Sequence, residues 1–272
     1  MLFLSIDWDP SIELVKIGSF AVRYYSLMFV IAFVLGLQIM KKIFNREGVK
    51  IEKLDSLFIY TVIATLLGAR IGHFLFYDTA FLFSNPLEVL LPVKFNPFQF
   101  TGYQGLASHG AAIGIIIAMY FYSKKVIQKP MLWILDRIVI PVASGAIFVR
   151  IGNLMNSEII GKPTNTDYGF VFKQLGEDFP RHPTQLYEAF GYLITFIVLW
   201  FVYWKTDKRE KLGYLFGLFM VFLWSVRLIV EFFKEAQVDQ RGDWDLNTGQ
   251  LLSIPMILVG FYFMFRKSSK KA

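Results

Sequence analysis

The chain has 272 residues, of which 55% are hydrophobic and 18% are charged, and its formal net charge is +7 at pH 7. A soluble domain is usually nearer one quarter charged, so this composition favours a membrane protein. The absence of cysteine excludes disulfides, an enzyme thiolate nucleophile and cysteine-ligated metals. Most Lys and Arg residues lie in the loops between the predicted membrane spans. Their distribution is explained by membrane topology and does not indicate a nucleic-acid partner.

Seven apolar segments have the length of a membrane span, which needs about 20 residues. In chain order they are approximately 20–40, 56–77, 105–122, 132–156, 185–204, 212–233 and 249–265. The sequence therefore predicts an all-α, polytopic membrane protein with about seven transmembrane helices. We expect residues 1–272 to form a single integral-membrane domain.

The distribution of Lys and Arg predicts the orientation of these spans. The loops after the first, third and fifth spans and the C-terminal tail hold most of the basic residues, such as Lys41, Lys124 and Arg209. Because cytoplasmic loops carry the excess of Lys and Arg, we expect the N-terminus outside and the C-terminus in the cytoplasm. The loop of about residues 157–184 then belongs to a small external head.

Polar side chains gather at one predicted depth. Arg70, Arg150 and Arg227 lie toward the external ends of the second, fourth and sixth spans, while Tyr25 and His109 open the first and third. A charged side chain within a membrane is costly and is by default a sign of function. These residues predict one polar cavity that opens toward the outer leaflet or the external water.

Residue spacing supports a shared site. Arg150 and Asn153 are three residues apart, and Arg227 and Glu231 are four apart, so each pair shares a helix face. Guanidinium groups stay charged and bind phosphate through two hydrogen bonds, which favours a phospholipid headgroup as ligand. Two alternatives remain open: Arg70 is a structural or snorkelling residue, and Glu231 only neutralises Arg227.

No other catalytic motif is evident. The three histidines lack metal-ligand spacing, and no zinc-protease motif or glycine-rich phosphate loop is present. The sequence therefore predicts no metal site and no cofactor.

Six stretches together resemble a known family. They are GARIGHFLFYD, ASHGAAIG, RIGNLMNSEIIGKPT, RHPTQLYEA, VRLIVEFFKE and GQLLSIPM. In order and spacing they are similar to those of the bacterial prolipoprotein diacylglyceryl transferases, over nearly the whole chain. Two departures stand out: the family's H-G-G is His109-Gly110-Ala111 here, and its N-G-E is Asn156-Ser157-Glu158.

The resemblance implies an integral-membrane catalytic domain in the bacterial inner (cytoplasmic) membrane, with its active site toward the outer leaflet or periplasmic side. Its expected reaction moves the diacylglyceryl group of phosphatidylglycerol to the lipobox cysteine thiol of a prolipoprotein, forming a thioether and releasing glycerol phosphate. The expected partners are phosphatidylglycerol, the prolipoprotein signal peptide with its lipobox cysteine, and membrane lipids.

The resemblance also assigns residues. It implies catalytic importance for His109, Arg150, Arg227 and Glu231, and it matches Tyr25, Asn153 and Gly161 to family positions. With the arginine argument above, the expected phosphatidylglycerol-binding residues are Arg150, Arg227, Asn153, Tyr25, Arg70 and Gly161.

Two questions stay open at this point. A free thiol has a pKa of about 8.5, so either His109 or Glu231 acts as base or the positive field of the arginines lowers the thiol pKa. The alternative function is a phospholipid or anion transporter that uses the same intramembrane arginines, and a third is a non-catalytic lipid-binding scaffold.

Overall fold

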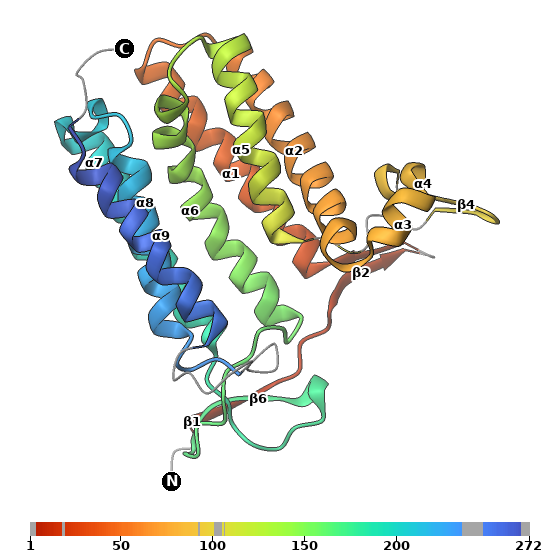
Figure 1. The fold of residues 1–272 in the computed structure, drawn as a ribbon. Coiled ribbons are helices and arrows are strands. Elements are labelled where there is room, and N and C mark those ends of the chain that lie inside the picture. The colour runs from red at the N-terminus through yellow and green to blue at the C-terminus, as the bar shows by residue number, and fades with distance from the viewer. Residues whose placement is uncertain are drawn as a thin grey trace. The chain divides into compact units, whose positions relative to one another are not determined.

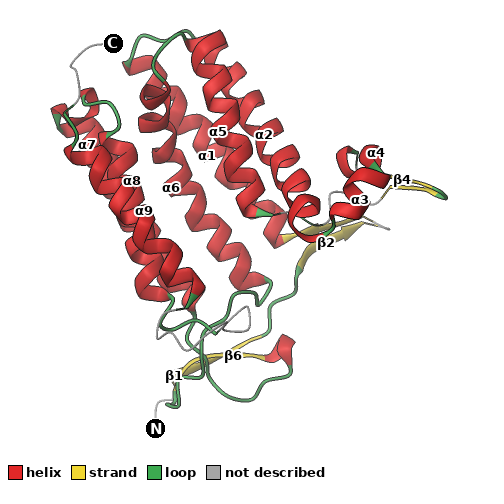
Figure 2. Ribbon diagram, viewed as in Figure 1, coloured by secondary structure: helices red, strands yellow, loops and turns green. Residues whose placement is uncertain are grey.

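The computed structural model describes residues 4–17, 20–91, 93–100, 105, 107–235 and 247–267. These residues are mostly helical and include a few short strands (Figure 2). They group into two compact units, which are described separately below. The first extends to Met40 and resumes at Leu135, and the second is Lys41–Ile134 (Figure 1). That the whole chain acts as one domain stays a prediction.

The first unit combines long helices with short strands. Strand β1 (Leu4–Trp8) pairs in parallel with β6 (Tyr168–Phe172), and β2 (Glu13–Ile17) pairs antiparallel with β3 (Phe20–Arg23). The helices are α1 (Tyr24–Arg46) up to Met40, α6 (Met131–Met155) from Leu135 on, α7 (Thr184–Lys205), α8 (Tyr214–Val230) and α9 (Thr248–Phe265), with short 3-10 helices at Lys173–Leu175 and Asp207–Glu210.

A buried carboxylate connects α6 to the start of α8. Asp136 is fully buried, and its two oxygens accept hydrogen bonds from the backbone N–H groups of Gly213, at 2.6 Å, and Phe216, at 2.9 Å. The first N–H groups of a helix have no intrahelical partner, so this side chain caps α8 from another helix. The contact fixes the two helices that carry Arg150 and Arg227.

The second unit is built on two closely packed helices. Its elements are α2 (Ile51–Tyr77), α3 (Thr79–Ser84), α4 (Pro86–Leu90), β4 (Val93–Phe95), β5 (Phe98–Phe100) and α5 (Ser108–Tyr122), and a π-helical turn (Ser123–Ile127) follows α5. A Cβ atom on Gly72 of α2 would lie 2.5 Å from the Cα of Gly110 of α5. Such a close approach requires glycine at both positions.

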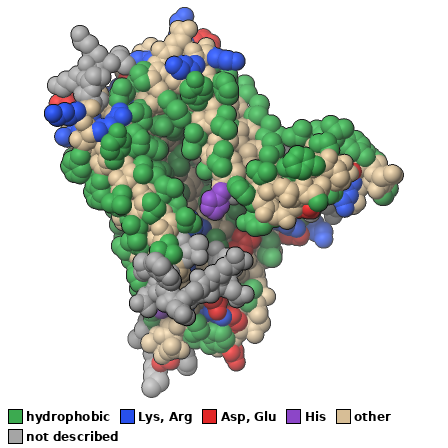
Figure 3. All heavy atoms as spheres, viewed as in Figure 1, with side chains coloured by type: hydrophobic (Ala, Val, Ile, Leu, Met, Phe, Trp, Pro, Cys, Tyr) green, Lys and Arg blue, Asp and Glu red, His purple; other side chains and the backbone are tan. Residues whose placement is uncertain are grey.

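The described helices confirm a polytopic membrane protein. Five are long and apolar enough to cross a bilayer: Tyr24–Arg46, Ile51–Tyr77, His109–Ile127, Met131–Met155 and Thr184–Lys205. Two shorter apolar helices, Tyr214–Val230 and Gly249–Phe265, complete the predicted set. Apolar side chains cover the sides of the helices on the face shown in Figure 3, as hydrocarbon contact requires.

The predicted boundary of the first span was wrong. Residues 20–23 form strand β3, and the helix begins at Tyr24 and continues to Arg46. The apolar run "FAV" is compatible with both a strand and a helix, and it is the hairpin with β2 that decides for the strand. The orientation of the spans remains a prediction.

Candidate active site

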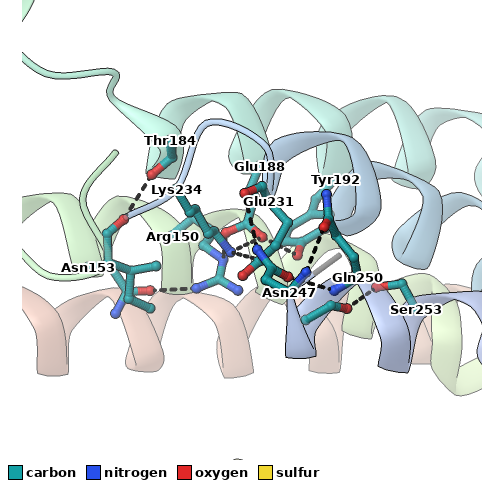
Figure 4. Close-up of polar contacts among 12 residues, drawn as sticks. Arg150, Asn153, Thr184, Glu188, Tyr192, Glu231, Lys234, Asn247, Gln250 and Ser253 are labelled. Carbon is teal, nitrogen blue, oxygen red and sulfur yellow. Dashed lines mark hydrogen bonds and ion pairs between the residues drawn. The ribbon is translucent and has the colours of Figure 1, made fainter. Parts of the chain in front are cut away.

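The site begins at Arg150, in the last two turns of α6. Its Nε atom lies 2.7 Å from Oε2 of Glu188 on α7, and its Nη1 atom donates to Oδ1 of Asn153 at 3.1 Å. Figure 4 shows the guanidinium between these two side chains. The Arg150 side chain is 15% exposed and that of Glu188 is 0% exposed. The Tyr192 side chain also lies against this guanidinium, with the Arg150 Cζ atom 5.9 Å from the centre of the Tyr192 ring.

Glu188 also joins Arg150 to a second cation. Lys234 places its Nζ atom 2.8 Å from Oε1 of Glu188 and 3.4 Å from Oε2 of Glu231. The hydroxyl of Tyr192 donates to the same Glu188 oxygen at 3.4 Å. A buried carboxylate is tolerated only when it is paired and hydrogen-bonded. These side chains therefore form one ionic network in the interior of the first unit (Figure 4).

Lys234 is held in place by the loop around Gly161. The two residues form an antiparallel bridge, and the N–H of Lys162 donates to the carbonyl of Phe233 at 2.8 Å. A Cβ on Gly161 would lie 2.6 Å from the Cβ of His182 and 2.9 Å from the Phe233 carbonyl oxygen. Only glycine fits this crowded position, so its geometry points to positioning Lys234 rather than to contacting a ligand.

Arg181 stabilises the same loop from the other side. Its guanidinium is within 2.7 Å of carboxylate oxygens of Glu177 and Glu235 and donates to the carbonyl of Gly161 at 3.1 Å. The hydrogen bond with Glu177 raises the pKa of Arg181 above its ordinary value. Burial lowers the pKa of the neighbouring His182 below its ordinary value.

Arg227 is different from Arg150. Its Cζ atom lies 5.4 Å from the centre of the Trp224 ring, and its Nε atom is buried without a hydrogen-bond partner within the described ranges. Among these residues no carboxylate lies within ion-pair distance of it, although Glu231 follows it by one helical turn. Both Arg227 and Arg150 are close enough to act electrostatically on the hydroxyl of Tyr192. Within the described ranges, Arg227 therefore has no carboxylate as a direct partner.

A second branch of the network leads outward from Asn153. Its Nδ2 donates to Oε2 of Glu158 at 3.0 Å, and Asn156 donates to Oε1 of the same carboxylate at 3.1 Å. Ser157 and Ile159, on either side of Glu158, have φ angles of 52° and 57°. Non-glycine residues rarely adopt this left-handed conformation. The family's glycine at position 157 suits it, and Ser157 adopts it here while donating to Gln174 at 3.0 Å.

Tyr25 lies on the same side of the unit as Arg150. It is the second residue of α1, and a Cβ on Gly152 would lie 2.8 Å from its Cδ2 atom. Its ring therefore packs directly against the α6 segment between Arg150 and Asn153.

Two predicted site residues belong to the second unit. Arg70 is 7% exposed, and it donates from Nε to the carbonyl of Val89 at 3.1 Å and from Nη2 to that of Glu88 at 3.2 Å. These contacts favour the structural alternative for Arg70. His109 is exposed in the first turn of α5, next to the tightly packed Gly110.

The structure adds two residues to the predicted set, Glu188 and Lys234. Lys234 lies three residues after Glu231, a spacing that places both on one helical face. This spacing could have indicated a role for Lys234 in the site, but the sequence is equally compatible with an ordinary charged lysine in a loop. Within the described ranges, no three His, Asp or Glu side chains cluster in a way that could hold a metal ion.

Taken together, the described part of the chain combines apolar helices long enough to cross a bilayer with a buried ionic network in its first unit, which defines the class of polytopic integral-membrane proteins. The family model for prolipoprotein diacylglyceryl transferase matches residues 13–266. The chain belongs to this family.

Relatives agree over almost the full length. A Bacteroides fragilis protein named phosphatidylglycerol–prolipoprotein diacylglyceryl transferase is 41% identical over 274 residues, covering 100% of this chain and 98% of its own. Proteins of the same name from Chloroherpeton thalassium and Tolumonas auensis are 38% and 37% identical, covering 96% and 97% of this chain and 94% and 98% of their own. The transporter alternative receives no support from these names.

Proposed function

We propose that this protein transfers the diacylglyceryl group of phosphatidylglycerol to the lipobox cysteine thiol of prolipoproteins, in the bacterial inner membrane and toward its outer leaflet. In this reaction the thiol sulfur bonds to C3 of the lipid glycerol while the bond from C3 to the phosphate oxygen breaks. The thiol proton goes to a base, and glycerol phosphate leaves. Family membership and the names of the relatives support this reaction.

Arg227 is the observation that carries the proposal, because its Nε atom is buried and has no hydrogen-bond partner among the described residues. A buried polar group without a partner is costly, and the oxygens of a phosphodiester can accept its hydrogen bond. Arg150, held by Glu188 and Asn153, offers a second guanidinium in a fixed orientation. Donors that are already oriented stabilise the charge that develops on a leaving group without reorganisation. We assign lipid phosphate binding to both arginines.

Asn153 and Tyr25 are proposed to complete the lipid site. The amide of Asn153 accepts a hydrogen bond from Arg150 and donates one to Glu158, so it holds both side chains in place. The ring of Tyr25 packs against the neighbouring Gly152 of α6. Gly161 contributes through the position of Lys234. Arg70 is proposed to act on stability, because backbone carbonyls already accept from its guanidinium.

The thiol proton has two candidate acceptors. Glu231 carries a carboxylate in the ionic network, where its Oε2 atom lies 3.4 Å from the Nζ atom of Lys234. His109 is exposed in the first turn of α5, and histidine is the side chain that most often acts as a general base. The variants His109→Gln and Glu231→Gln separate them, because only loss of the true base removes the acid limb of the pH–rate profile.

A transfer assay tests the proposal. Purified protein in detergent receives phosphatidylglycerol and a lipobox peptide, and mass spectrometry follows the peptide. We expect a mass gain of one diacylglyceryl unit on cysteine, which is absent with a Cys→Ser peptide. Failure to form the adduct, in a protein that still binds phosphatidylglycerol, would contradict the proposed function.

A further inference from the structure

The outer branch of the network ends in a carboxylate whose position is unusually well defined. Glu158 is exposed, yet each of its oxygens accepts one side-chain amide, from Asn153 at 3.0 Å and from Asn156 at 3.1 Å. Its backbone is held as well: its N–H donates to the carbonyl of Asn153 at 2.9 Å, and its carbonyl accepts from Gln185 at 2.6 Å.

The local backbone reinforces this presentation. Ser157 and the β-branched Ile159 both have positive φ angles, 52° and 57°. Such conformations persist only where surrounding contacts determine them, and they concentrate at functional positions. An exposed carboxylate held by strained backbone and two amides is more than a loop residue needs for solubility.

Two acceptor atoms beside Glu158 have no partner among the described residues. Asn156 Oδ1 and Gln185 Oε1 are buried and have no hydrogen-bond partner within the part of the chain that the structure describes. Each oxygen of an ionised carboxylate accepts about two hydrogen bonds, so each Glu158 oxygen retains one acceptor direction. The ligand group that fits here must bring its own donors.

The location identifies the part of the ligand. Asn153 connects Glu158 directly to Arg150, so a phosphate at Arg150 places its headgroup substituent near Glu158. The glycerol headgroup carries hydroxyls on two adjacent carbons. Two donors on neighbouring atoms match two carboxylate oxygens with one free direction each, as in the recognition of ribose hydroxyls by an acidic side chain.

We infer that Glu158, oriented by Asn153 and Asn156, accepts hydrogen bonds from the glycerol hydroxyls of the lipid headgroup and so determines headgroup specificity. This inference rests on the proposed function, because it concerns the leaving half of the same substrate. The role differs from that of Arg150 and Arg227, which hold the phosphate common to all phospholipids.

The test compares two donors of equal charge and identical acyl chains: phosphatidylglycerol, and phosphatidylethanol, whose headgroup has no hydroxyl. For the unaltered protein we expect transfer from phosphatidylethanol to be about 10- to 100-fold slower in kcat/KM, the range for hydrogen bonds to a charged group. Glu158→Gln should lose a similar factor with phosphatidylglycerol and change less than about threefold with phosphatidylethanol, so that the selectivity nearly disappears.

Asp167→Asn is the matched control, because it removes an exposed carboxylate from the same external loop; it should keep the full selectivity. If Glu158→Gln does not fold, Asn156→Ala replaces it and should reduce the selectivity ratio. Equal use of both donors by the unaltered protein, or an equal loss on both donors in a folded variant, would overturn the inference. The proposed function itself fails only if phosphatidylglycerol supports no transfer at all.

Discussion

Arg150 and Arg70 both lie near the C-terminal end of a long apolar helix, yet their guanidinium groups meet different kinds of acceptor. Arg70 donates to the backbone carbonyls of Glu88 and Val89 in α4. Arg150 instead contacts two side chains, Glu188 and Asn153, that have further partners of their own. A guanidinium bound to backbone fixes the path of the chain, whereas one bound to a side-chain network is oriented and remains able to bind an anion.

Removing the carboxylate at the centre of the network should have the largest effect. Glu188→Ala leaves Arg150 and Lys234 without their shared counter-charge, and breaking a buried pair costs about 3–5 kcal/mol. We expect a correspondingly lower free energy of unfolding and no measurable transfer. Chemical denaturation in detergent measures the first quantity. Unchanged stability would show that the two cations find another partner, and the contrast with Arg70 would lose its basis.

Neutralising Arg150 should reduce catalysis more than stability, because Lys234 still pairs with the buried Glu188 when the guanidinium is removed. For Arg150→Gln we expect kcat to fall about 10²- to 10³-fold, the usual effect of losing one oriented donor to a developing charge. The transfer assay measures this, with thermal stability in detergent as the check on folding. A variant that transfers at more than one tenth of the original rate would exclude Arg150 from phosphate stabilisation.

Crowding the Gly161 loop tests how the network is positioned. Gly161→Ala forces a Cβ against His182 and the Phe233 carbonyl, and such overpacking costs about 1–3 kcal/mol. Because Lys234 pairs with this loop, we expect lower kcat as well as lower stability. A change in stability alone would separate the loop from the ionic network.

Arg70→Gln is the counterpart of Arg150→Gln. The loss of hydrogen bonds to two carbonyls should reduce stability by about 1–2 kcal/mol, while kcat per folded molecule changes less than about threefold. Both quantities come from the same two assays. If kcat falls as steeply as for Arg150→Gln, Arg70 belongs to the lipid site after all.

The smallest effect concerns pH. The folded state lowers the pKa of His182 through burial, so the unfolded chain binds more protons and stability rises with pH in this range. The contribution of the neutral His182 to the free energy of unfolding is fully present above about pH 6.5, the pKa of an unperturbed histidine. It is lost as the pH falls through the lower pKa of the folded state. Melting temperatures between pH 7.5 and 5.5 should therefore fall less in His182→Gln than in the unaltered protein; equal slopes would contradict this.

Much of the fold follows from apolar segment length. Both ends of α6 and α7 and the C-terminal end of α2 were predicted to within one residue, whereas α2 begins five residues earlier than predicted. Such agreement is expected because a bilayer leaves the backbone few alternatives to a helix. The strand Phe20–Arg23 was not predicted, because the hydrophobic periodicity of this short run does not reveal that it pairs with β2.

The site was predictable where the helical spacing is regular and less so elsewhere. Arg150 and Asn153 were predicted to share one helix face, and their side chains form a hydrogen bond in the structure. Glu188 was not among the predicted site residues, because its fully buried position between two cations depends on how α6 and α7 pack. The role of Lys234 could not be predicted without knowing that it forms a bridge with Gly161, which lies more than 70 residues earlier in the chain.

The parallel pairing of β1 with β6 has a consequence for the biogenesis of the protein. Leu4 is matched with Tyr168, so the first strand leaves the ribosome about 160 residues before its partner exists. At about 5–20 residues per second this interval is roughly 10 to 30 seconds. During that time the four long apolar helices α1, α2, α5 and α6 are synthesised while the edge of β1 has no partner strand, so the start of the chain reaches its final structure only after more than half of the protein has been made.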